Sequence, residues 1–157
     1  MVLRRNNLGF TLIELLVSMA IIGILSTVGL GSFLSSQIKS RDARRKSDLG
    51  NIQKALEMYF VDHGSYPKSD SAGQIVIGSG LEWNSRAQMK DSNDTIYMQE
   101  LPSDPTALPN YCYKSPGDAY QLYARLENLN DPQRLPANVS CNGIDYDYGV
   151  ASSNSKP

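Results

Sequence analysis

A single carboxylate, Glu14, lies near the start of the most apolar part of the sequence. It is the only charged residue between Arg5 and Lys39. An ionised carboxylate in apolar surroundings is unfavourable unless a cation or hydrogen-bond donors satisfy it. Thr11 and Glu14 have the spacing of a capping box, in which each side chain bonds to the backbone N–H of the other residue. That local role accounts for neither the basic residues before Glu14 nor the apolar residues after it, so Glu14 is the first candidate functional residue.

The two cysteines, Cys112 and Cys141, are the second candidate pair, and both lie in the C-terminal part of the chain. A disulfide between them would close a loop of about 30 residues and stabilise the fold by roughly 3.5 kcal/mol in the chain-entropy model. It would also place this part of the chain in an oxidising compartment. Two buried free thiols are the alternative. The spacings typical of a zinc site are missing from the sequence.

A search of the sequence for catalytic residues finds little. His63 is the only histidine, and it falls where we expect a helix to end, with no nucleophile motif nearby. The sequence has neither a phosphate-binding glycine motif nor a metal-binding cluster. Its net charge is -1, which gives no sign of a nucleic-acid partner. We therefore predict a protein that is not an enzyme and that has no catalytic residues, metal site or cofactor.

One long helix is expected to carry Glu14. Segment 10–34 is apolar apart from Glu14, and a helix of about 25 residues would span roughly 37 Å, enough to cross a membrane. No proline precedes Pro67, so the helix can continue beyond the apolar run. Apolar residues then recur at three- and four-residue steps over 49–60, which predicts an amphipathic half. Gly64 and Pro67 predict its end.

A basic run, "KSRDARRK", separates the two halves of this helix at positions 39–46. This run could contact lipid phosphates or the acidic face of a neighbouring subunit. Charged runs on a helix more often form a solvated or inter-subunit surface, and we expect such a surface here.

The second half of the chain predicts a small antiparallel sheet. Segment 111–127 reads as a hairpin, because two Tyr-rich alternating runs flank the turn residues Pro116 and Gly117. Segment 142–150 reads as a third strand. Its predicted buried face carries Ile144, Tyr146, Tyr148 and Val150, and one face of the preceding strand carries Tyr120, Leu122, Ala124 and Leu126. Packing of the amphipathic helix on this sheet gives an α+β fold.

The segment "GFTLIELLVSMAIIGILS" resembles the N-terminus of type IV pilins and type II secretion pseudopilins. The family pattern is a short basic leader that ends in glycine, followed by phenylalanine and, as the fifth mature residue, glutamate. Here Arg4 and Arg5 supply the leader charge, Gly9 ends the leader, Phe10 begins the mature chain and Glu14 is the fifth-position carboxylate.

The resemblance implies a processing and assembly route. A prepilin peptidase would cut between Gly9 and Phe10 on the cytoplasmic side and N-methylate Phe10. The subunit would then leave the membrane and pack its apolar helix among copies of itself in a filament, built by secretion or pilus assembly machinery. There Glu14 would pair with the amino group of a neighbouring Phe10, which would satisfy the lone charge.

The similarity continues past the apolar segment. "DARRKSDLGNIQKALEMYFVDHGSYP" resembles the second half of the helix in major pseudopilins, and "YMQELPSDP" resembles the loop before their sheet. The implied organisation is a leader at 1–9, a transmembrane and filament-core helix at 10–34, an amphipathic helix at 35–64 and a small head at 65–157. We expect the tail of the head to be disordered. Many relatives have proline where this chain has Gly31, so any flexible point in the helix would depend on glycines.

Calcium is the one ion that the resemblance suggests, because major pseudopilins carry a calcium loop near the C-terminus. Asp131, Asp145 and Asp147 are available here, but they match no ligand spacing. We expect them to be solvated carboxylates, and calcium binding is left open.

Three hypotheses follow: a filament subunit, a membrane-anchored extracytoplasmic binding module that does not polymerise, and a secreted enzyme with a signal sequence. The cysteines look more like those of a pilin, whereas the small head and "LPSDP" favour a pseudopilin. The positive-inside count places run 39–46, and hence the head, in the cytoplasm. The leader motif and the cysteine pair indicate the opposite. We expect a single pass through the inner membrane, with the N-terminus cytoplasmic and the head extracytoplasmic.

Overall fold

The computed structural model describes residues 9–157 except 79, 84 and 107–109, and it leaves the side chains of residues 28–30 undescribed. Most of the expected leader, residues 1–8, therefore lies outside the described residues. The chain divides into two compact units, Met1–Gln37 and Ile38–Pro157. We describe each unit by itself.

The helix α1 spans Leu12–His63, as the absence of proline predicts, and it runs through Gly31 without interruption. It begins with the predicted capping box. The Thr11 N–H donates to Glu14 Oε2 at 2.9 Å, and the Glu14 N–H donates to Thr11 Oγ1 at 3.3 Å. The helix ends at Gly64, which has a φ of 70° and whose N–H donates to the Phe60 carbonyl oxygen at 2.8 Å. Glycine adopts this left-handed conformation without the strain that a Cβ would cause.

In the first unit, the described apolar side chains of α1 are exposed. Leu12 is 76% exposed, and Ile24, Leu25 and Leu34 each exceed 60%. The hydroxyl groups on this stretch bond to the helix itself, as when Ser26 Oγ donates to the Ile22 carbonyl oxygen at 2.7 Å. Within the described residues, α1 is the one helix long and apolar enough to cross a membrane by length and composition. A surface of this kind needs lipid or other apolar helices around it.

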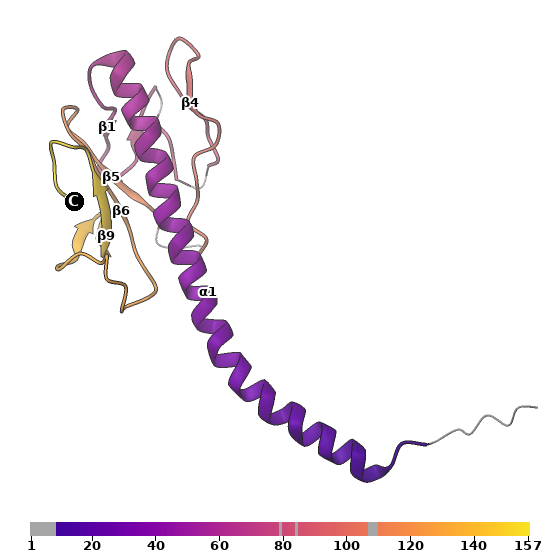
Figure 1. Cartoon of the computed structure of the whole chain (residues 1–157). Coiled ribbons are helices and arrows are strands. Elements are labelled where there is room, and N and C mark those ends of the chain that lie inside the picture. The colour runs from indigo at the N-terminus through magenta and orange to yellow at the C-terminus, as the bar shows by residue number, and fades with distance from the viewer. Residues whose placement is uncertain (1–8, 79, 84, 107–109) are drawn as a thin grey trace, which may run out of the picture. The chain divides into compact units, whose positions relative to one another are not determined.

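The second unit adds short antiparallel strands to the rest of α1. They are β1 (Lys68–Ser69), β2 (Ile75–Val76), β3 (Met89–Lys90), β4 (Ile96–Met98), β5 (Cys112–Lys114), β6 (Gln121–Ala124), β7 (Val139–Cys141), β8 (Ile144–Tyr146) and β9 (Tyr148–Ala151). The central sheet has the order β5-β6-β9, and β1-β2, β3-β4 and β7-β8 form separate pairs. Figure 1 shows β5, β6 and β9 running beside the C-terminal half of α1. The expected α+β architecture is confirmed.

The core of this unit lies between α1 and one face of the central sheet. Leu49, Ile52 and Leu56 are fully buried on the helix, as the three- and four-residue spacing predicts. They pack in one cluster with Tyr113 and Leu122 of the β5–β6 hairpin. The predicted hairpin is confirmed, with Tyr113 paired to Leu122 across it. Each buried aliphatic side chain contributes about 1.5–3 kcal/mol relative to exposure.

The opposite face of the central sheet is buried as well. Cys112 and Tyr123 pair across β5 and β6, and they form a second cluster with Cys141 and Tyr146 of the β7–β8 hairpin. Strand alternation predicts that Tyr123 and Leu122 lie on opposite faces of the sheet. Tyr123 does lie on the face opposite Leu122, and the β7–β8 hairpin covers that face.

The prediction of one third strand over 142–150 is wrong. β8 pairs with β7, and β9 pairs with β6. The two strands separate at Asp147, whose Oδ1 accepts the Leu126 N–H at 2.7 Å and whose carbonyl oxygen accepts the Leu135 N–H at 2.7 Å. Of the four residues expected on one buried face, Tyr146 is buried, whereas Ile144, Tyr148 and Val150 are only partly so.

The C-terminal tail, for which we expect disorder, follows a defined course. Ser152 is buried and its N–H donates to the Tyr120 carbonyl oxygen at 3.1 Å. Farther along, Asn154 Nδ2 donates to the Asp118 carbonyl oxygen at 2.9 Å. These bonds hold the tail on the sheet.

Candidate functional site

The predicted processing residues lie just before the first turn of α1. Gly9 and Phe10 precede the helix, and both are exposed, with Phe10 at 81%. An added Cβ on Gly9 would meet no atom within 4 Å. Gly9 and Phe10 are therefore exposed in the described part of the chain, as the substrate of a protease must be.

Glu14 lies in a shallow hollow on the surface of the helix. Phe10, Ile13, Val17, Ser18 and Ile21 form the rest of its lining, so a carboxylate is surrounded by almost entirely apolar side chains. Its hydrogen bonds come from Thr11, through the N–H at 2.9 Å and through Oγ1 at 2.7 Å. Both bonds engage Oε2. The structure thus shows Glu14 in a capping box, with Thr11 as its local hydrogen-bond donor. A cation that approached the carboxylate could bond to it in addition.

A second group of charged residues follows on α1, where the basic run meets acidic residues of the head. We call it the ion-pair cluster. It consists of Arg41, Asp42, Arg44, Arg45, Lys46 and Asp48 of the helix together with Asp104, Glu127 and Asp131. The expectation that the basic run forms a solvated or inter-subunit surface is therefore wrong for Arg45, which is buried. Arg41 and Lys46 stay partly exposed, and they bond to acidic residues of the head.

Arg45 is the centre of the ion-pair cluster, and its side chain is only 1% exposed. Its Nε and Nη2 donate to both oxygens of Asp104, at 2.7 and 2.9 Å. Its Nη1 donates to Asp42 at 2.8 Å and to Glu127 at 2.7 Å. Burial alone would lower the pKa of Arg45, but these carboxylates outweigh burial and raise it. Bidentate pairing of this kind is among the strongest hydrogen-bonded arrangements in proteins.

Asp42 and Glu127 extend the cluster to the loop after β6. The Asp42 oxygens accept the N–H groups of Glu127 and Asn128 at 2.9 and 2.8 Å. Glu127 also accepts from Arg41 Nε at 2.7 Å. The hydrogen bond from Arg41 is the main reason why the pKa of Glu127 falls to about 2, despite some opposing burial. Charged hydrogen bonds therefore hold this loop to the helix.

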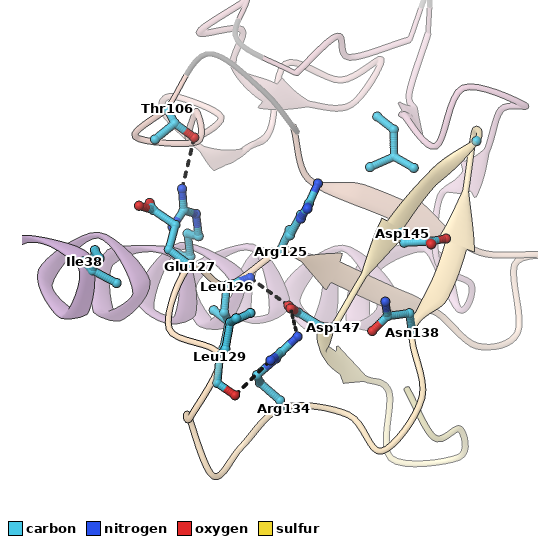
Figure 2. A pocket seen from close by; sticks show the side chains of 13 residues that line it. Ile38, Thr106, Arg125, Leu126, Glu127, Leu129, Arg134, Asn138, Asp145 and Asp147 are labelled. Carbon is cyan, nitrogen blue, oxygen red and sulfur yellow. Dashed lines mark hydrogen bonds and ion pairs between the residues drawn. The ribbon is translucent and has the colours of Figure 1, made fainter. Parts of the chain in front are cut away.

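The three aspartates considered for calcium do not converge. Asp131 accepts from Lys46 at 2.7 Å, and this bond is the main cause of its lowered pKa. Asp147 is buried and pairs with Arg134 at 2.8 Å. Figure 2 shows Arg134 reaching from Asp147 to the Leu129 carbonyl oxygen beside a hollow of about 820 Å³. Only Asp145 is exposed, so the expectation of solvated carboxylates is wrong for the other two. Among the described residues, no group of three His, Cys, Asp or Glu side chains is arranged so that it could hold a metal ion.

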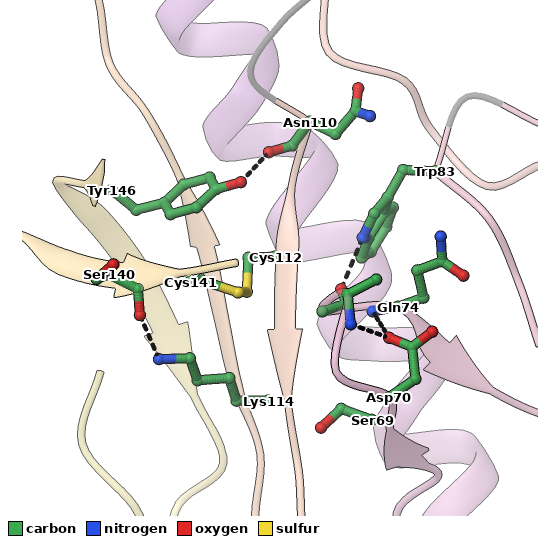
Figure 3. The surroundings of a disulfide bond; sticks show 12 residues. Ser69, Asp70, Gln74, Trp83, Asn110, Cys112, Lys114, Ser140, Cys141 and Tyr146 are labelled. Carbon is green, nitrogen blue, oxygen red and sulfur yellow. Dashed lines mark hydrogen bonds between the residues drawn. A yellow bond between two sulfur atoms is a disulfide. The ribbon is translucent and has the colours of Figure 1, made fainter. Parts of the chain in front are cut away.

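Cys112 and Cys141 form a disulfide, with their Cα atoms 6.5 Å apart. The bond joins β5 to β7 and lies beneath the loop that carries Gly73 (Figure 3). The Gly73 carbonyl oxygen accepts both the Trp83 Nε1–H at 2.8 Å and the Tyr113 N–H at 2.9 Å. The alternative of two free thiols does not hold in this structure.

His63 packs at the end of α1, as expected. Its ring stacks on Tyr59 with the centroids 4.0 Å apart. Its Nδ1 lies 3.1 Å from the Tyr59 carbonyl oxygen, and Nε2 lies 3.5 Å from an Asp91 oxygen. These contacts fasten the helix end to the β3–β4 hairpin.

Sequence reasoning missed the central position of Arg45, and it missed the partners of this residue in the head. Asp104 and Glu127 are 59 and 82 residues from Arg45 along the chain. A pattern based on nearby residues can include Asp42, three positions away, but it gives no signal for partners that only the folded head brings close. "LPSDP" was noted for its resemblance, without a role for its aspartate.

Comparisons with known proteins give matches over most of the chain. The model of the prokaryotic N-terminal methylation motif matches residues 4–30, and that of type II secretion system protein G matches residues 32–126. A type II secretion system core protein G of Pseudomonas aeruginosa is 32% identical over 126 residues, covering 77% of this chain and 86% of that protein. The proteins of the same name from Vibrio cholerae and Aeromonas hydrophila are 29% and 28% identical over 114 residues, covering 73% of this chain and 75% and 77% of those proteins. No solved structure gives a significant match.

Proposed function

The chain belongs to the type II secretion system protein G family, and we propose how its N-terminal segment takes it from a membrane anchor to a subunit of the pseudopilus. Membership of this family makes it a structural pseudopilin and not an enzyme, and it settles the choice between pilin and pseudopilin. The residues that carry processing and assembly are our proposal: cleavage between Gly9 and Phe10, N-methylation of Phe10, and pairing of Glu14 with the Phe10 amine of a neighbouring copy.

The position of Glu14 on an exposed apolar helix carries this proposal. A helix with this surface is stable in lipid or among other apolar helices, and in both places an ionised carboxylate needs a counter-charge. The described ion pairs of this chain begin at Arg41, far from Glu14 along the helix. Cleavage after Gly9 would create a new cation, the Phe10 amine, within the same turn of chain as Glu14. Because the bonds from Thr11 engage Oε2, Glu14 Oε1 would accept from the amine of the neighbour.

The proposed location is the inner membrane first, with a cytoplasmic N-terminus and an extracytoplasmic head, and the filament afterwards. The disulfide supports an oxidising compartment for the head. The positive-inside count of run 39–46 points the other way, and the pairing of Arg41, Arg45 and Lys46 with acidic residues of the head arises only after the head has folded. The partners implied by the family are further copies of this chain, a prepilin peptidase and the secretion machinery.

Mass spectrometry of the mature protein tests the processing step. We expect the chain purified from cells that contain a prepilin peptidase to begin at a monomethylated Phe10. The Gly9→Leu variant should keep its leader, because the side chain added before the cut would block the peptidase, while Gly31→Leu should be processed normally. A chain that keeps Met1, or one cut within the apolar segment as a secretory signal is, would contradict the proposal.

A further inference from the structure

The basic run directly after the apolar helix changes its charge balance when the head folds. Taken alone, residues 39–46 hold five cations and one acid, Asp42, which gives a local net charge of +4. Runs of Lys and Arg next to a membrane span bind anionic lipid headgroups, at about 1 kcal/mol per cation. In an unfolded chain, this run is therefore well suited to hold the anchor against an anionic lipid surface.

The folded head supplies the missing negative charges. Asp104, Glu127 and Asp131 come from the head, and Asp48 comes from the next turn of α1. Segment 39–48, with Asp42 and Asp48, has a net charge of +3 by itself. The three head acids bring the local net charge to zero, and they pair with Arg41, Arg45 and Lys46. The pairing is close, since Arg45 lies within 2.9 Å of Asp42 and Asp104, and Lys46 lies 2.7 Å from Asp131.

The cations are also partly removed from water. The side chains of Arg45, Lys46 and Arg41 are 1%, 22% and 33% exposed. Arg44 is 61% exposed, with Asp48 at 3.9 Å, and Lys39 is the one cation of the run outside the ion pairs described. Two of the five cations thus stay accessible to a headgroup after folding.

We propose that the run 39–46 is an anionic-lipid binding segment that the folded head masks. When the head is unfolded, its cations bind the phosphate groups of anionic lipids. When the head folds, Asp104, Glu127 and Asp131 pair with cations of the run. The subunit then binds the headgroups more weakly. This inference rests on the proposed function in one respect: a subunit that enters a filament must leave the membrane. A basic run that still bound lipid headgroups would oppose that step.

Vesicle partitioning of the full chain, with no peptidase or secretion component present, tests the masking. The chain is partitioned from detergent micelles into vesicles that contain phosphatidylglycerol and, separately, into vesicles that lack it. The measured quantity is the ratio of the first partition coefficient to the second. For the pair Glu127→Gln and Asp131→Asn, we expect this ratio to rise about fivefold for each cation released. The pair Glu82→Gln and Asp118→Asn changes the net charge equally on exposed acids that take part in none of the described ion pairs, and it should leave the ratio within about twofold of the wild type. Equal increases for the two pairs, or no increase for the first, would overturn the proposal.

A rescue variant separates unmasking from a failure to fold. In the Asp131→Asn background, Lys46→Gln removes the cation that Asp131 no longer pairs, and it should return the ratio to the wild-type value. A ratio that stays high would mean that the increase does not come from the release of Lys46 by Asp131, and the masking proposal would fall. Because the assay contains isolated subunits, its result does not depend on whether Glu14 and Phe10 act as proposed.

Discussion

At the residue scale, Arg45 shows how a buried cation can be satisfied completely by its fold. The guanidinium is planar and its donors are fixed in direction, which suits two oxygens of one carboxylate. Asp104 takes that position, while Asp42 and Glu127 accept from Nη1. Lysine could not reproduce this set of bonds. Among the described ion pairs, Arg45 is the one cation that bonds to Asp42 and Asp104, both of which are buried.

Loss of Arg45 should therefore be costly. We expect Arg45→Met to lower the free energy of unfolding by about 3–5 kcal/mol, because it leaves buried carboxylates without a counter-charge. Arg44→Met removes an exposed cation one residue away and should change stability by no more than about 0.5 kcal/mol. Urea unfolding of the full chain in detergent, followed by circular dichroism, measures both. Similar small losses would mean that Arg45 does not hold the head to the helix.

Residues with local signals could be predicted from the sequence, and residues with distant partners could not. Glu14 stands out because it is alone in an apolar run, and the cysteines because they are the only two. The burial of Arg45, by contrast, depends on Asp104 and Glu127, which no local pattern joins to it. From the sequence alone, a run of cations is predicted to be solvated, because the acidic residues that pair with it in the folded head are far away along the chain.

At the element scale, the central sheet is covered on both faces, and the loop from Asp70 to Gln74 closes over the disulfide. Asp70 Oδ1 accepts the N–H groups of Ala72 and Gln74 at 2.9 and 2.8 Å, which shapes the loop. Gly73 has a φ of 74°, and a Cβ added to it would lie 2.8 Å from both disulfide sulfurs. This position therefore requires glycine for its conformation and for the space above the disulfide.

We expect Gly73→Ala to lower the free energy of unfolding by about 2–4 kcal/mol, since it combines backbone strain with overpacking. Gly78→Ala is the matched control. Gly78 has a φ of 64° but open space around its Cα, so that variant should lose only about 1 kcal/mol from strain. The same urea assay compares them. If both variants lose equally, contact with the disulfide does not restrict this loop.

Secondary structure could be predicted where one periodicity or turn signal dominated. The helix and the β5–β6 hairpin meet that condition. The split between β8 and β9 does not, because it depends on Asp147 turning inward to bond to Leu126 and Arg134. Alternation along 142–150 continues through this point, and a sequence pattern has no means of showing the bend.

At the scale of the whole molecule, two units with different requirements share one helix. The first unit exposes apolar side chains that need lipid or neighbouring helices. The second unit is a folded head with its own core, a disulfide and the ion-pair cluster. The protein family could be predicted from the spacing of Gly9, Phe10 and Glu14, since these residues lie within six positions of the sequence. The cancellation of charge around run 39–46 could not, because it is a property of the folded head.

The central claim is that Glu14 serves assembly through its charge, and Thr11 provides a matched control. Thr11→Ala removes the capping side chain, at a cost of about 1 kcal/mol in helix stability, but it keeps the carboxylate. Glu14→Ala removes the charge. If Glu14 acted only as a cap, both variants would fail alike.

Electron microscopy of filaments from cells that overproduce the chain together with its secretion machinery is the direct measurement. We predict that the wild type and Thr11→Ala form filaments, whereas Glu14→Ala inserts into the membrane and accumulates there without forming any. Filaments of Glu14→Ala as abundant as those of the wild type would contradict the account.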